Sequence, residues 1–471
     1  MGNFFTTLDA AGHALDAFQR AIDVTQGNVT NANTPGYVKQ VAVLRSVDAG
    51  AGRDAVGGVI EQTVDSRNQF AETSVQQQVS LLGEFQQLQA SLTPLQTAFD
   101  VSSSSAIPSA LNQLFQSFSN WSTQPNDATA QANVINAAQQ AAAAFQQTAT
   151  QLATIRGTTD ATLRSTVAQI NQDAAKVQAY NAAVAREGGS NASLDSQLYS
   201  ALEDLSSLTD VQVIPGIGSS VTVLLGGQTP LVIGDQVNAL QVQTDTSNAP
   251  IGPPNATIVD STNKDVTAGI TSGSLYGLLT VRNGLIPSLA GGGQQVGDLN
   301  TLAKGLADSV NNLLAQGSTT SSPPYQAGVP MFTYNSTSPT NVAASLSVNS
   351  AITPSQLAAT DPGPPPVSNG IALKLAGLDN VTGGQINGLS FTQYFGSLVT
   401  RIGNAVSNAN TSASAQAQLV TQAKNLRQQV SGVSIDEEAV NLVQLQSSYQ
   451  AVSKVVTVVD QLTQTLINMV Q

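Results

Sequence analysis

The sequence predicts an α+β multidomain protein with paired N- and C-terminal coiled-coil helices, a long-helix bundle domain, and an inserted β-rich module. Apolar residues recur at alternating spacings of three and four near both ends of the chain, which is the heptad pattern of a coiled coil. The Ala- and Gln-rich stretch 126–186 contains no proline, which favours helix. In residues 210–242, Val, Ile and Leu alternate with other residues, which is typical of strands.

The first helix is expected to run from Phe4 to Val29. Its apolar stripe, with one threonine, is Phe4, Leu8, Ala11, Leu15, Phe18, Ile22, Thr25 and Val29. The segment Asn28–Gly36 should end this helix, because Asn side chains compete for backbone hydrogen bonds and Pro35-Gly36 suits a type II turn. The β-branched segment Tyr37–Leu44 is expected to be extended.

The middle of the chain alternates between signals for helix, strand and loop. Helices are expected at 69–99, 108–121, 126–186, 193–208 and 299–314. Whether 126–186 is one helix or two helices broken at Gly157 stays open. Strands are expected within 210–242, a polar loop with strand fragments at 248–264, a loop at 317–330, and β-hairpins with turns at 332–357. The run Asp361–Pro366 marks an exposed linker or loop tip.

The carboxyl-terminal region is helical again, from 391 to 430 and from Ser434 onward. Ser434–Glu437 has the form of a capping box, and the acidic run Asp436–Glu438 suits the positive end of a helix. The second stripe is Leu442, Leu445, Tyr449, Val452, Val456, Val459, Thr463, Leu466 and Val470. Its spacing fits either two core helices of one bundle or a coiled coil completed between subunits.

These signals divide the chain into three parts. A terminal coiled-coil assembly domain is expected at 1–65 and 431–471. A mainly helical domain is expected at 66–208 and 270–430, with a β and loop region at about 331–390. The inserted β-rich module is expected at 209–269.

Charge is scarce, and this excludes several classes of protein. Charged residues make up 10% of the chain, against roughly 25% in a typical soluble domain. Between Ser309 and Thr360 only tyrosines can ionise. The net charge of −13 argues against binding to nucleic acid or to an anionic membrane surface, both of which attract basic patches.

The scarcity of nucleophiles and metal ligands argues against most enzyme chemistry. The chain has no cysteine and a single histidine, His13, so thiolate catalysis and multi-histidine metal sites are excluded, and no cofactor is expected. The amino end lacks the features of a secretory signal peptide, and no run of about 18 apolar residues occurs that could span a bilayer.

Two motifs at opposite ends of the chain resemble those of the bacterial flagellar rod, hook and hook-associated proteins. At the amino end, an apolar helix leads into Asn28-Val-Thr-Asn-Ala-Asn-Thr-Pro-Gly-Tyr37, and the carboxyl end Ser431–Ala451 is similar to the terminal helix of the same superfamily. The turn residues that match this motif are Asn28, Asn31, Asn33, Thr34, Pro35, Gly36 and Tyr37.

Within that superfamily the chain is most similar to the family of hook-associated protein 1, the first hook–filament junction protein. The long helices from 69 to 208, the helix at 194–208 that leads into strands, and Ser272–Asn283 resemble the corresponding parts of that family. Hook and rod proteins, by contrast, have mainly β central parts.

The resemblance implies a structural subunit that leaves the cell unfolded through the flagellar type III export channel and assembles extracellularly. The implied partners are further copies in a ring or helical homo-oligomer, hook protein, the second hook-associated junction protein, and a cytosolic export chaperone at the C-terminal helix. The side chains expected at the subunit interface are Phe4, Leu8, Leu15, Phe18, Ile22, Leu442, Leu445, Tyr449, Val452, Val456, Val459 and Leu466.

Two alternatives belong to other classes. Thirty acidic residues could supply the carboxylate pair of a secreted glycan hydrolase, although a helix amino end explains the acidic triplet Asp436–Glu438. The chain could also be another secreted protein: the second junction protein, a hook or rod component, a flagellin, or a type III translocator. The Thr-Pro-Gly-Tyr motif counts against flagellin, and the lack of an apolar membrane hairpin counts against a translocator.

Overall fold

The computed structural model describes residues 2–34, 36–47, 58–245, 251–380 and 386–470, except for the side chains of 2–5, 46–47, 58–61, 466–467 and 470. The α-helices are α1 Gly2–Asn31, α2 Gln69–Ala98, α3 Ile107–Thr123, α4 Ala128–Glu187, α5 Ala192–Leu208, α6 Gly273–Thr280, α7 Ile286–Ala290, α8 Asp298–Gln316, α9 Val342–Ser345, α10 Gly370–Ala376, α11 Phe391–Ser431 and α12 Ile435–Val470. A π-helix, η3, spans Val281–Leu285 between α6 and α7.

The strands are short and pair only antiparallel within the described residues. They are β1 Gln40–Val47, β2 Gly58–Asp65, β3 Val211–Pro215, β4 Val221–Leu225, β5 Thr229–Ile233, β6 Gln236–Val237, β7 Gln241–Thr244, β8 Ala256–Val259, β9 Phe332–Thr333 and β10 Ser347–Val348. They form one four-stranded sheet in the order β3-β4-β5-β6 and three two-stranded sheets, β1-β2, β7-β8 and β9-β10.

Contacts divide the chain into two compact units. The first contains residues 1–80, 172–237 and 416–471, and the second contains residues 81–171 and 238–415. The helices α2, α4 and α11 contribute residues to both units.

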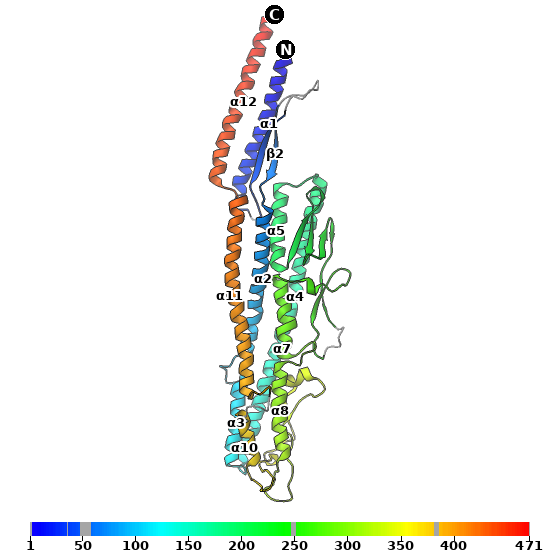
Figure 1. The fold of residues 1–471 in the computed structure, drawn as a ribbon, viewed down its shortest axis with the longest axis vertical. Helices are drawn as coiled ribbons and strands as arrows, with labels where there is room; N and C mark the ends of the chain where they lie inside the picture. The colour runs from blue at the N-terminus through cyan, green and yellow to red at the C-terminus, as the bar shows by residue number, and fades with distance from the viewer. Residues whose placement is uncertain (1, 35, 48–57, 246–250, 381–385, 471) are drawn as a thin grey trace. The chain divides into compact units, whose positions relative to one another are not determined.

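In the first unit, the two ends of the chain form a helix pair. Helices α1 and α12 lie side by side and run in opposite directions, so that both chain termini lie at the same tip (Figure 1). The β1-β2 hairpin packs along α1, with Gln40 opposite Asp65 at its base. The paired terminal helices predicted from the two stripes are therefore confirmed.

The four-stranded sheet of the first unit packs on the last part of α4. Alternate residues of β4, Val221, Val223 and Leu225, face inward and are buried. The Asn181 side chain of α4 donates hydrogen bonds to the carbonyl oxygens of Val221, at the start of β4, and Gly234, just after β5. These two bonds hold the open end of the β4-β5 hairpin against the helix.

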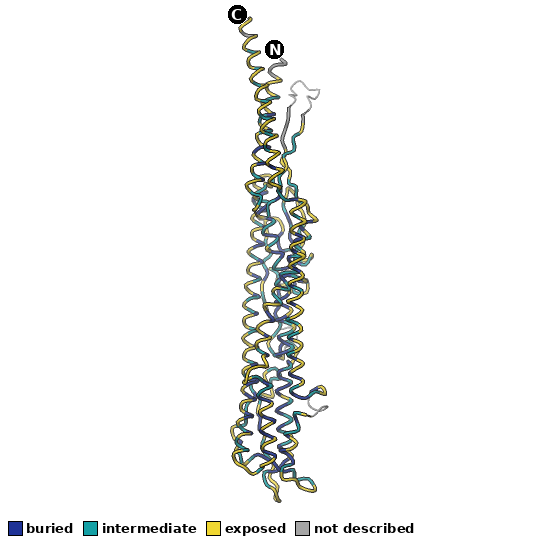
Figure 2. The backbone as a smooth tube through the Cα atoms, turned by 90° about the vertical axis from the view of Figure 1, so that its left-hand side faces the viewer, coloured by how far each residue is buried: buried dark blue, intermediate teal, exposed yellow. Residues whose placement is uncertain are grey.

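The second unit has an apolar core in which aromatic rings of α3 and α11 meet. The rings of Phe115 and Phe391 stack with centroids 6.2 Å apart, and Phe99 contacts Phe395 at 5.8 Å. Trp121 is fully buried, and its indole N–H donates a hydrogen bond to the carbonyl of Pro125, as expected for a core tryptophan. Figure 2 shows that buried residues, in dark blue, gather on the inward sides of the long helices.

The α+β multidomain fold predicted from the sequence is confirmed. The stretch 126–186 is one helix, because nothing packs within 4 Å of the place a Gly157 side chain would occupy and a lone exposed glycine costs only about 1 kcal/mol. The hairpins expected at 332–357 reduce to the two-residue strands β9 and β10, with α9 between them. Polar side chains satisfy the backbone there: the Asn311 side chain bonds both the N–H and the C=O of Phe332. None of the described helices combines the length and apolar character that crossing a membrane requires.

Candidate functional site at the joint between the chain ends

The base of the α1/α12 pair is organised by a buried asparagine. Asn28, near the end of α1, is 1% exposed. Its amide nitrogen donates to the carbonyl of Gln40 at 2.8 Å and to Oε2 of Glu438 at 2.8 Å. Its amide oxygen accepts from the hydroxyl of Tyr37 and from the backbone N–H of Gln40, both at 2.9 Å. This side chain therefore uses its full hydrogen-bonding capacity to join α1, the following turn and α12.

Glu438, in the first turns of α12, is the carboxylate that completes this joint. It is 2% exposed, and its second oxygen, Oε1, lies 3.0 Å from the Lys39 ammonium in an ion pair without good hydrogen-bond alignment. Lys39 also contacts Glu437, which is exposed, at 3.2 Å. Burial alone would lower the pKa of Lys39, but these two carboxylates raise it above its ordinary value. The lysine is therefore firmly charged at neutral pH.

The turn after α1 requires glycine at position 36. Gly36 has a φ of +75°, and a Cβ added there would overlap the carbonyl oxygen of Ser196 in α5. The N–H of Tyr37 bonds the carbonyl of Thr34, which closes the turn. Burial raises the pKa of the Tyr37 phenol, and the nearby Glu438 carboxylate raises it further, so the hydroxyl stays protonated as a donor to Asn28.

The rest of the turn motif points elsewhere. Asn31 and Thr34 line a pocket of about 760 Å³ together with residues 190–193 and 195–197, and Asn33 is exposed. Pro35 lies outside the described residues. Asn28, Gly36 and Tyr37 of the motif thus build the joint, whereas Asn31, Asn33 and Thr34 make no contact with Glu438 or Lys39 that the structure records.

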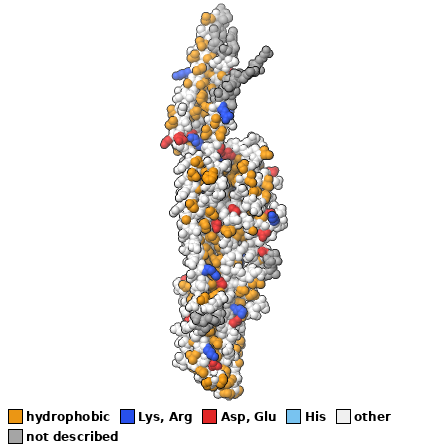
Figure 3. Space-filling model, in the orientation of Figure 1, with side chains coloured by type: hydrophobic (Ala, Val, Ile, Leu, Met, Phe, Trp, Pro, Cys, Tyr) orange, Lys and Arg blue, Asp and Glu red, His pale blue; other side chains and the backbone are white. Residues whose placement is uncertain are grey.

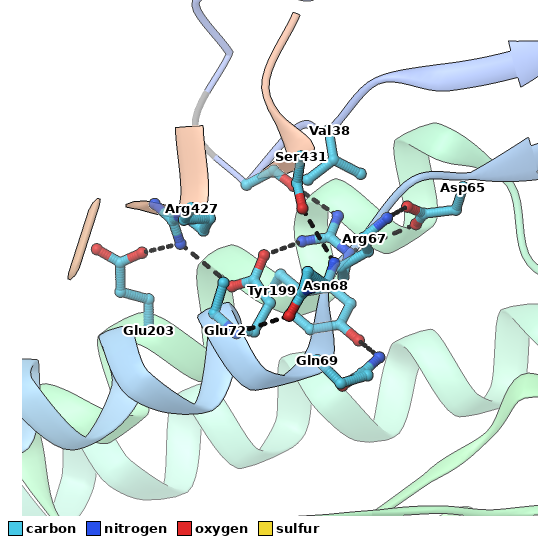
Figure 4. Close-up of polar contacts among 12 residues, drawn as sticks. Val38, Asp65, Arg67, Asn68, Gln69, Glu72, Tyr199, Glu203, Arg427 and Ser431 are labelled. Carbon is cyan, nitrogen blue, oxygen red and sulfur yellow. Dashed lines mark hydrogen bonds and ion pairs between the residues drawn. The ribbon is translucent and has the colours of Figure 1, made fainter. Parts of the chain in front are cut away.

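A second cluster, around Arg67, ties the end of β2 to α2 and α5 (Figure 4). The Arg67 guanidinium bonds Glu72 at 2.7 Å, Asp65 at 3.4 Å and the carbonyl of Gly36 at 2.8 Å. Its planar head lies over the Tyr199 ring, 3.6 Å from the centroid. Since the Arg67 side chain is 5% exposed, these contacts replace nearly all of its hydration.

Arg427, from α11, extends this cluster across the first unit. Its Nη1 lies 3.2 Å from Glu72 and 2.9 Å from Glu203, so Glu72 bridges two arginines (Figure 4). Burial alone would raise the pKa of Glu203, but Lys424 and Arg427 outweigh it and lower that pKa below its usual value. The cluster balances its charges internally and needs no ligand to do so.

The break between α11 and α12 is fixed by Ser431. Its carbonyl accepts the N–H of Lys39 at 2.9 Å, and its hydroxyl accepts the N–H of Asn68 at 3.0 Å. The two clusters therefore meet at the point where the last helix begins.

The inner side of the helix pair holds the predicted stripe residues. Ile22 is buried, Leu15 and Phe18 are half-buried, and Leu8 is exposed toward the tip. On α12 the half-buried stripe residues are Leu442, Leu445, Tyr449, Val452, Val456, Val459 and Thr463. The side chains of Phe4 and Leu466 lie outside the described residues. The two stripes pack on each other within one chain.

The outer side of α12 carries a second apolar stripe that the heptad analysis did not find. At about 100° per residue, Val440, Val443 and Val458 fall more than 90° from the inner stripe, whereas Val455, Leu462 and Met469 border it on one side. These side chains are between 48% and 77% exposed: Val440, Val443, Val455, Val458, Leu462 and Met469. Figure 3 shows hydrophobic side chains at the surface along this helix. We call these six residues the outer stripe.

The outer side of α1 has the opposite character. Asp9, Asp16 and Asp23 recur every seven residues and are all exposed. The helix pair therefore presents an acidic face on one helix and an apolar face on the other. In the described part of the chain, no group of three or more His, Cys, Asp or Glu residues could hold a metal ion.

Comparison with known families identifies the chain. A family model of the flagellar hook-associated protein FlgK helical domain matches residues 92–332, slightly more than half of the sequence. The chain belongs to the flagellar hook-associated protein FlgK family. This FlgK family member is thus a structural protein of the flagellar hook–filament junction.

Two shorter family models match the segments that meet at the joint. A flagella basal body rod protein model matches residues 8–37, and a flagellar basal body rod FlgEFG protein C-terminal model matches residues 427–469. The first segment contains Asn28 and Tyr37, and the second contains Ser431 and Glu438. Two family signatures at opposite ends of this FlgK family chain are therefore bonded to each other in space.

Individual relatives agree with this assignment. The flagellar hook-associated protein 1 of Bacillus subtilis (strain 168) is 26% identical over 518 aligned positions, which cover 99% of each chain. That of Escherichia coli (strain K12) is 39% identical over 79 residues, 17% of this chain and 14% of the relative. The solved structure of the flagellar hook junction protein FlgK from Burkholderia pseudomallei has the same fold, with a TM-score of 0.63 at 16% identity, over 75% of this chain and 99% of that one.

Sequence reasoning found the turn motif of this FlgK family chain but missed its charged partners. The acidic run Asp436–Glu438 lies in the first turn of α12, as predicted, but the sequence does not show that Glu438 is buried and accepts a hydrogen bond from Asn28. Arg67 and Arg427 were not singled out. The rarity of charge is a signal that could have found them, because in a chain with so few charged residues each arginine beside an apolar run is a candidate for a buried pair.

Proposed function

We propose that the chain is exported unfolded through the flagellar type III channel and self-assembles outside the cell into a ring or helical homo-oligomer between hook and filament. The observation that carries this proposal is the outer stripe of α12, which remains exposed in the single chain. A helix whose apolar residues extend beyond the face that its own chain covers is suited to a more buried position. Further copies of the chain are the occupants that this proposal assigns to it.

The energetics favour assembly through this surface. Full burial of a Val or Leu side chain contributes about 1.5–3 kcal/mol, so six partly exposed apolar residues represent a substantial driving force. The acidic outer face of α1 cannot cover them in a neighbouring copy without desolvating Asp9, Asp16 or Asp23. Contacts between unlike surfaces extend from copy to copy, which suits a ring or a tube.

The ends of such an assembly would contact different proteins. We place hook protein on one side and the second hook-associated junction protein on the other, as the family resemblance implies. The acidic run at the start of α12 is assigned a structural role, since Glu437 and Glu438 both contact Lys39, and no catalytic role is proposed for it.

Before export, the exposed apolar residues of α12 would need to be bound by another protein in the cytosol. An amphipathic helix with an exposed apolar side fits a hydrophobic groove, and an uncovered apolar stripe promotes premature association. We therefore place the binding site of a cytosolic export chaperone on α12. Deletion of residues 434–471 should abolish a chaperone complex in a pull-down assay, and undiminished binding would place that site elsewhere.

The assembly proposal is tested with matched triple substitutions on α12. Val455→Asp, Val458→Asp and Leu462→Asp together should abolish attachment to the hook, and the filament subunits should then leak into the medium. The control changes three exposed polar residues of the same helix, Gln450→Asp, Ser453→Asp and Thr457→Asp, and should retain attachment and swimming. Normal swimming by the outer-stripe variant would refute the proposed role of α12.

A further inference from the structure

The inner stripe of α12 contains one buried charge. Glu438 precedes Leu442 by four residues and continues the spacing of that stripe, so it occupies a seam position facing α1. The other charged residues of α12, Asp436, Glu437, Lys454 and Asp460, are all exposed. Burying a carboxylate destabilises the folded state unless the carboxylate is paired, so Glu438 in the seam is expected to have a specific partner.

Its partner also occupies the seam. Ala14, Ala21 and Asn28 of α1 follow one another at intervals of seven, and all three are buried. Asn28 is thus the polar member of a row that is otherwise alanine. Thr25, the other buried polar residue nearby, bonds the carbonyl of Ala21 in its own helix and makes no demand on α12.

Apolar contacts alone do not set the register of this pair. A shift of α12 by seven residues, about 10 Å at 1.5 Å per residue, again places inner-stripe residues against the seam of α1. The same shift would move Glu438 from Asn28 to a position beside Ala21, where no donor awaits it. Breaking a buried pair in this way is strongly destabilising, because it leaves a buried charge without a partner.

A second contact prevents the carboxylate from following such a shift. Lys39, which pairs with Glu438, is anchored through its backbone N–H to the carbonyl of Ser431 at the end of α11. The position of the lysine is therefore independent of the helix seam. Both partners of Glu438 stand at one fixed height of the pair.

We propose that Glu438 is the positioning residue that selects one heptad register for α12 on α1, through Asn28 and Lys39. A single buried polar residue in a coiled-coil seam has this effect when the apolar positions permit several registers. The register also fixes the height at which the outer stripe stands relative to α1. The consequence for the outer stripe rests on the proposed function, since neighbouring copies would need their stripes at equal heights. The register of α12 on α1 does not depend on the proposed function.

The register can be measured directly, because the chain has no cysteine of its own. Gln26→Cys and Gln464→Cys place spin labels at exposed positions of α1 and α12, roughly 36 Å apart along the helix axes at 1.5 Å per residue. Double electron–electron resonance on the dilute full-length chain should give a single distance. With Glu438→Leu added, a second population should appear that is displaced by roughly 10 Å, one heptad. The control, Glu437→Leu, removes the exposed neighbour and should keep the single distance.

A compensating pair guards against a variant that simply unfolds. Asn28→Asp sets two carboxylates against each other and should split the distance distribution. Adding Glu438→Gln should restore one distance, because the glutamine amide can donate to the introduced carboxylate while that carboxylate still accepts from Tyr37 and Gln40. If Glu438→Leu and Asn28→Asp both retain the single distance, or if the double variant fails to restore it, the proposal is wrong. Neither result depends on assembly, so failure of the proposed function would leave this measurement intact.

Discussion

The guanidinium of Arg67 lies over the ring of Tyr199, 3.6 Å from its centroid, while its nitrogens bond the carboxylates of Glu72 and Asp65. The aromatic face excludes water from one side of the arginine, and the carboxylates neutralise it on the other. Arg67 is therefore the buried, fully paired centre of a charged cluster at the base of the helix pair.

Arg67→Ala should destabilise the chain strongly. Removing one member of a buried ion pair costs on the order of 3–5 kcal/mol, because Glu72 would be left with Arg427 alone. Arg67→Lys should rescue only part of the loss, since an ammonium cannot bond two carboxylates and stack on a ring at once. Urea denaturation measures both. The control is Lys304→Ala, which removes an exposed pair with Asp308 and should cost at most about 1 kcal/mol.

Substitutions at two glycines should have opposite effects. Gly36→Ala forces an L side chain into a φ of +75° and against the Ser196 carbonyl, so it should lower the free energy of unfolding. Gly12→Ala, within α1, meets nothing within 4 Å and should raise it by about 0.5–1 kcal/mol. Thermal melts followed by circular dichroism compare the two. A stabilised Gly36→Ala variant would contradict the turn geometry.

Adjacent valines of α12 should separate folding from assembly. Val459→Asp places a charge against α1 and should destabilise the isolated chain by more than about 1 kcal/mol. Val458→Asp places the same charge on the exposed outer stripe and should change monomer stability by less than about 0.5 kcal/mol. Denaturation of the purified monomer is the measurement. Equal losses at both positions would mean that the outer stripe is covered within the chain.

Stability should fall on acidification through Glu203. Because Lys424 and Arg427 hold its folded pKa below the ordinary value of 4.5, the contribution of Glu203 is fully present above that value and is lost as the pH falls through the folded pKa. Denaturation midpoints at about pH 6 and about pH 3 should differ less in Glu203→Gln than in the parent chain.

Glu84 provides the control of opposite sign. Burial raises its pKa, so the fold favours its protonated form, and that contribution is lost as the pH rises through the raised pKa. Glu84→Gln should therefore leave the acid-induced loss in place and should not lower stability at neutral pH. An acid-induced loss that is unchanged in Glu203→Gln would show that the pairing with Lys424 and Arg427 does not control it.

The sequence predicts those parts of the fold whose cause is local. The two stripes predict α1 and α12 because heptad spacing places Ile22 or Leu445 on one face whatever lies opposite. Gly36 in the turn is predictable for the same reason. The strand β2 was not expected, because Gly58–Asp65 acquires its structure by pairing with β1, and a pairing partner is not encoded in the segment itself.

The candidate site needed contacts over long distances in the sequence. Glu438 looks like a helix-capping acid beside Asp436 and Glu437, and only the fold places Asn28 against it. The outer stripe was overlooked because a heptad analysis assigns each helix one apolar face, and Val455 and Val458 fall outside that face. Such residues become visible only when the covered side of the helix is known.

The bond between Asn28 and Glu438 spans 410 positions of the chain. A contact of such high sequence separation is expected to form late in folding, because the chain between the two residues must lose conformational entropy before the contact can stabilise the fold. This entropic cost grows only with the logarithm of loop length. A chain that emerges from a narrow opening with either end first cannot form this bond until almost all of it is free. The helix that emerges first must wait without its partner, and a prematurely terminated chain never completes the joint. The hydrogen bond between Asn28 and Glu438 can therefore form only after all of residues 28–438 have emerged.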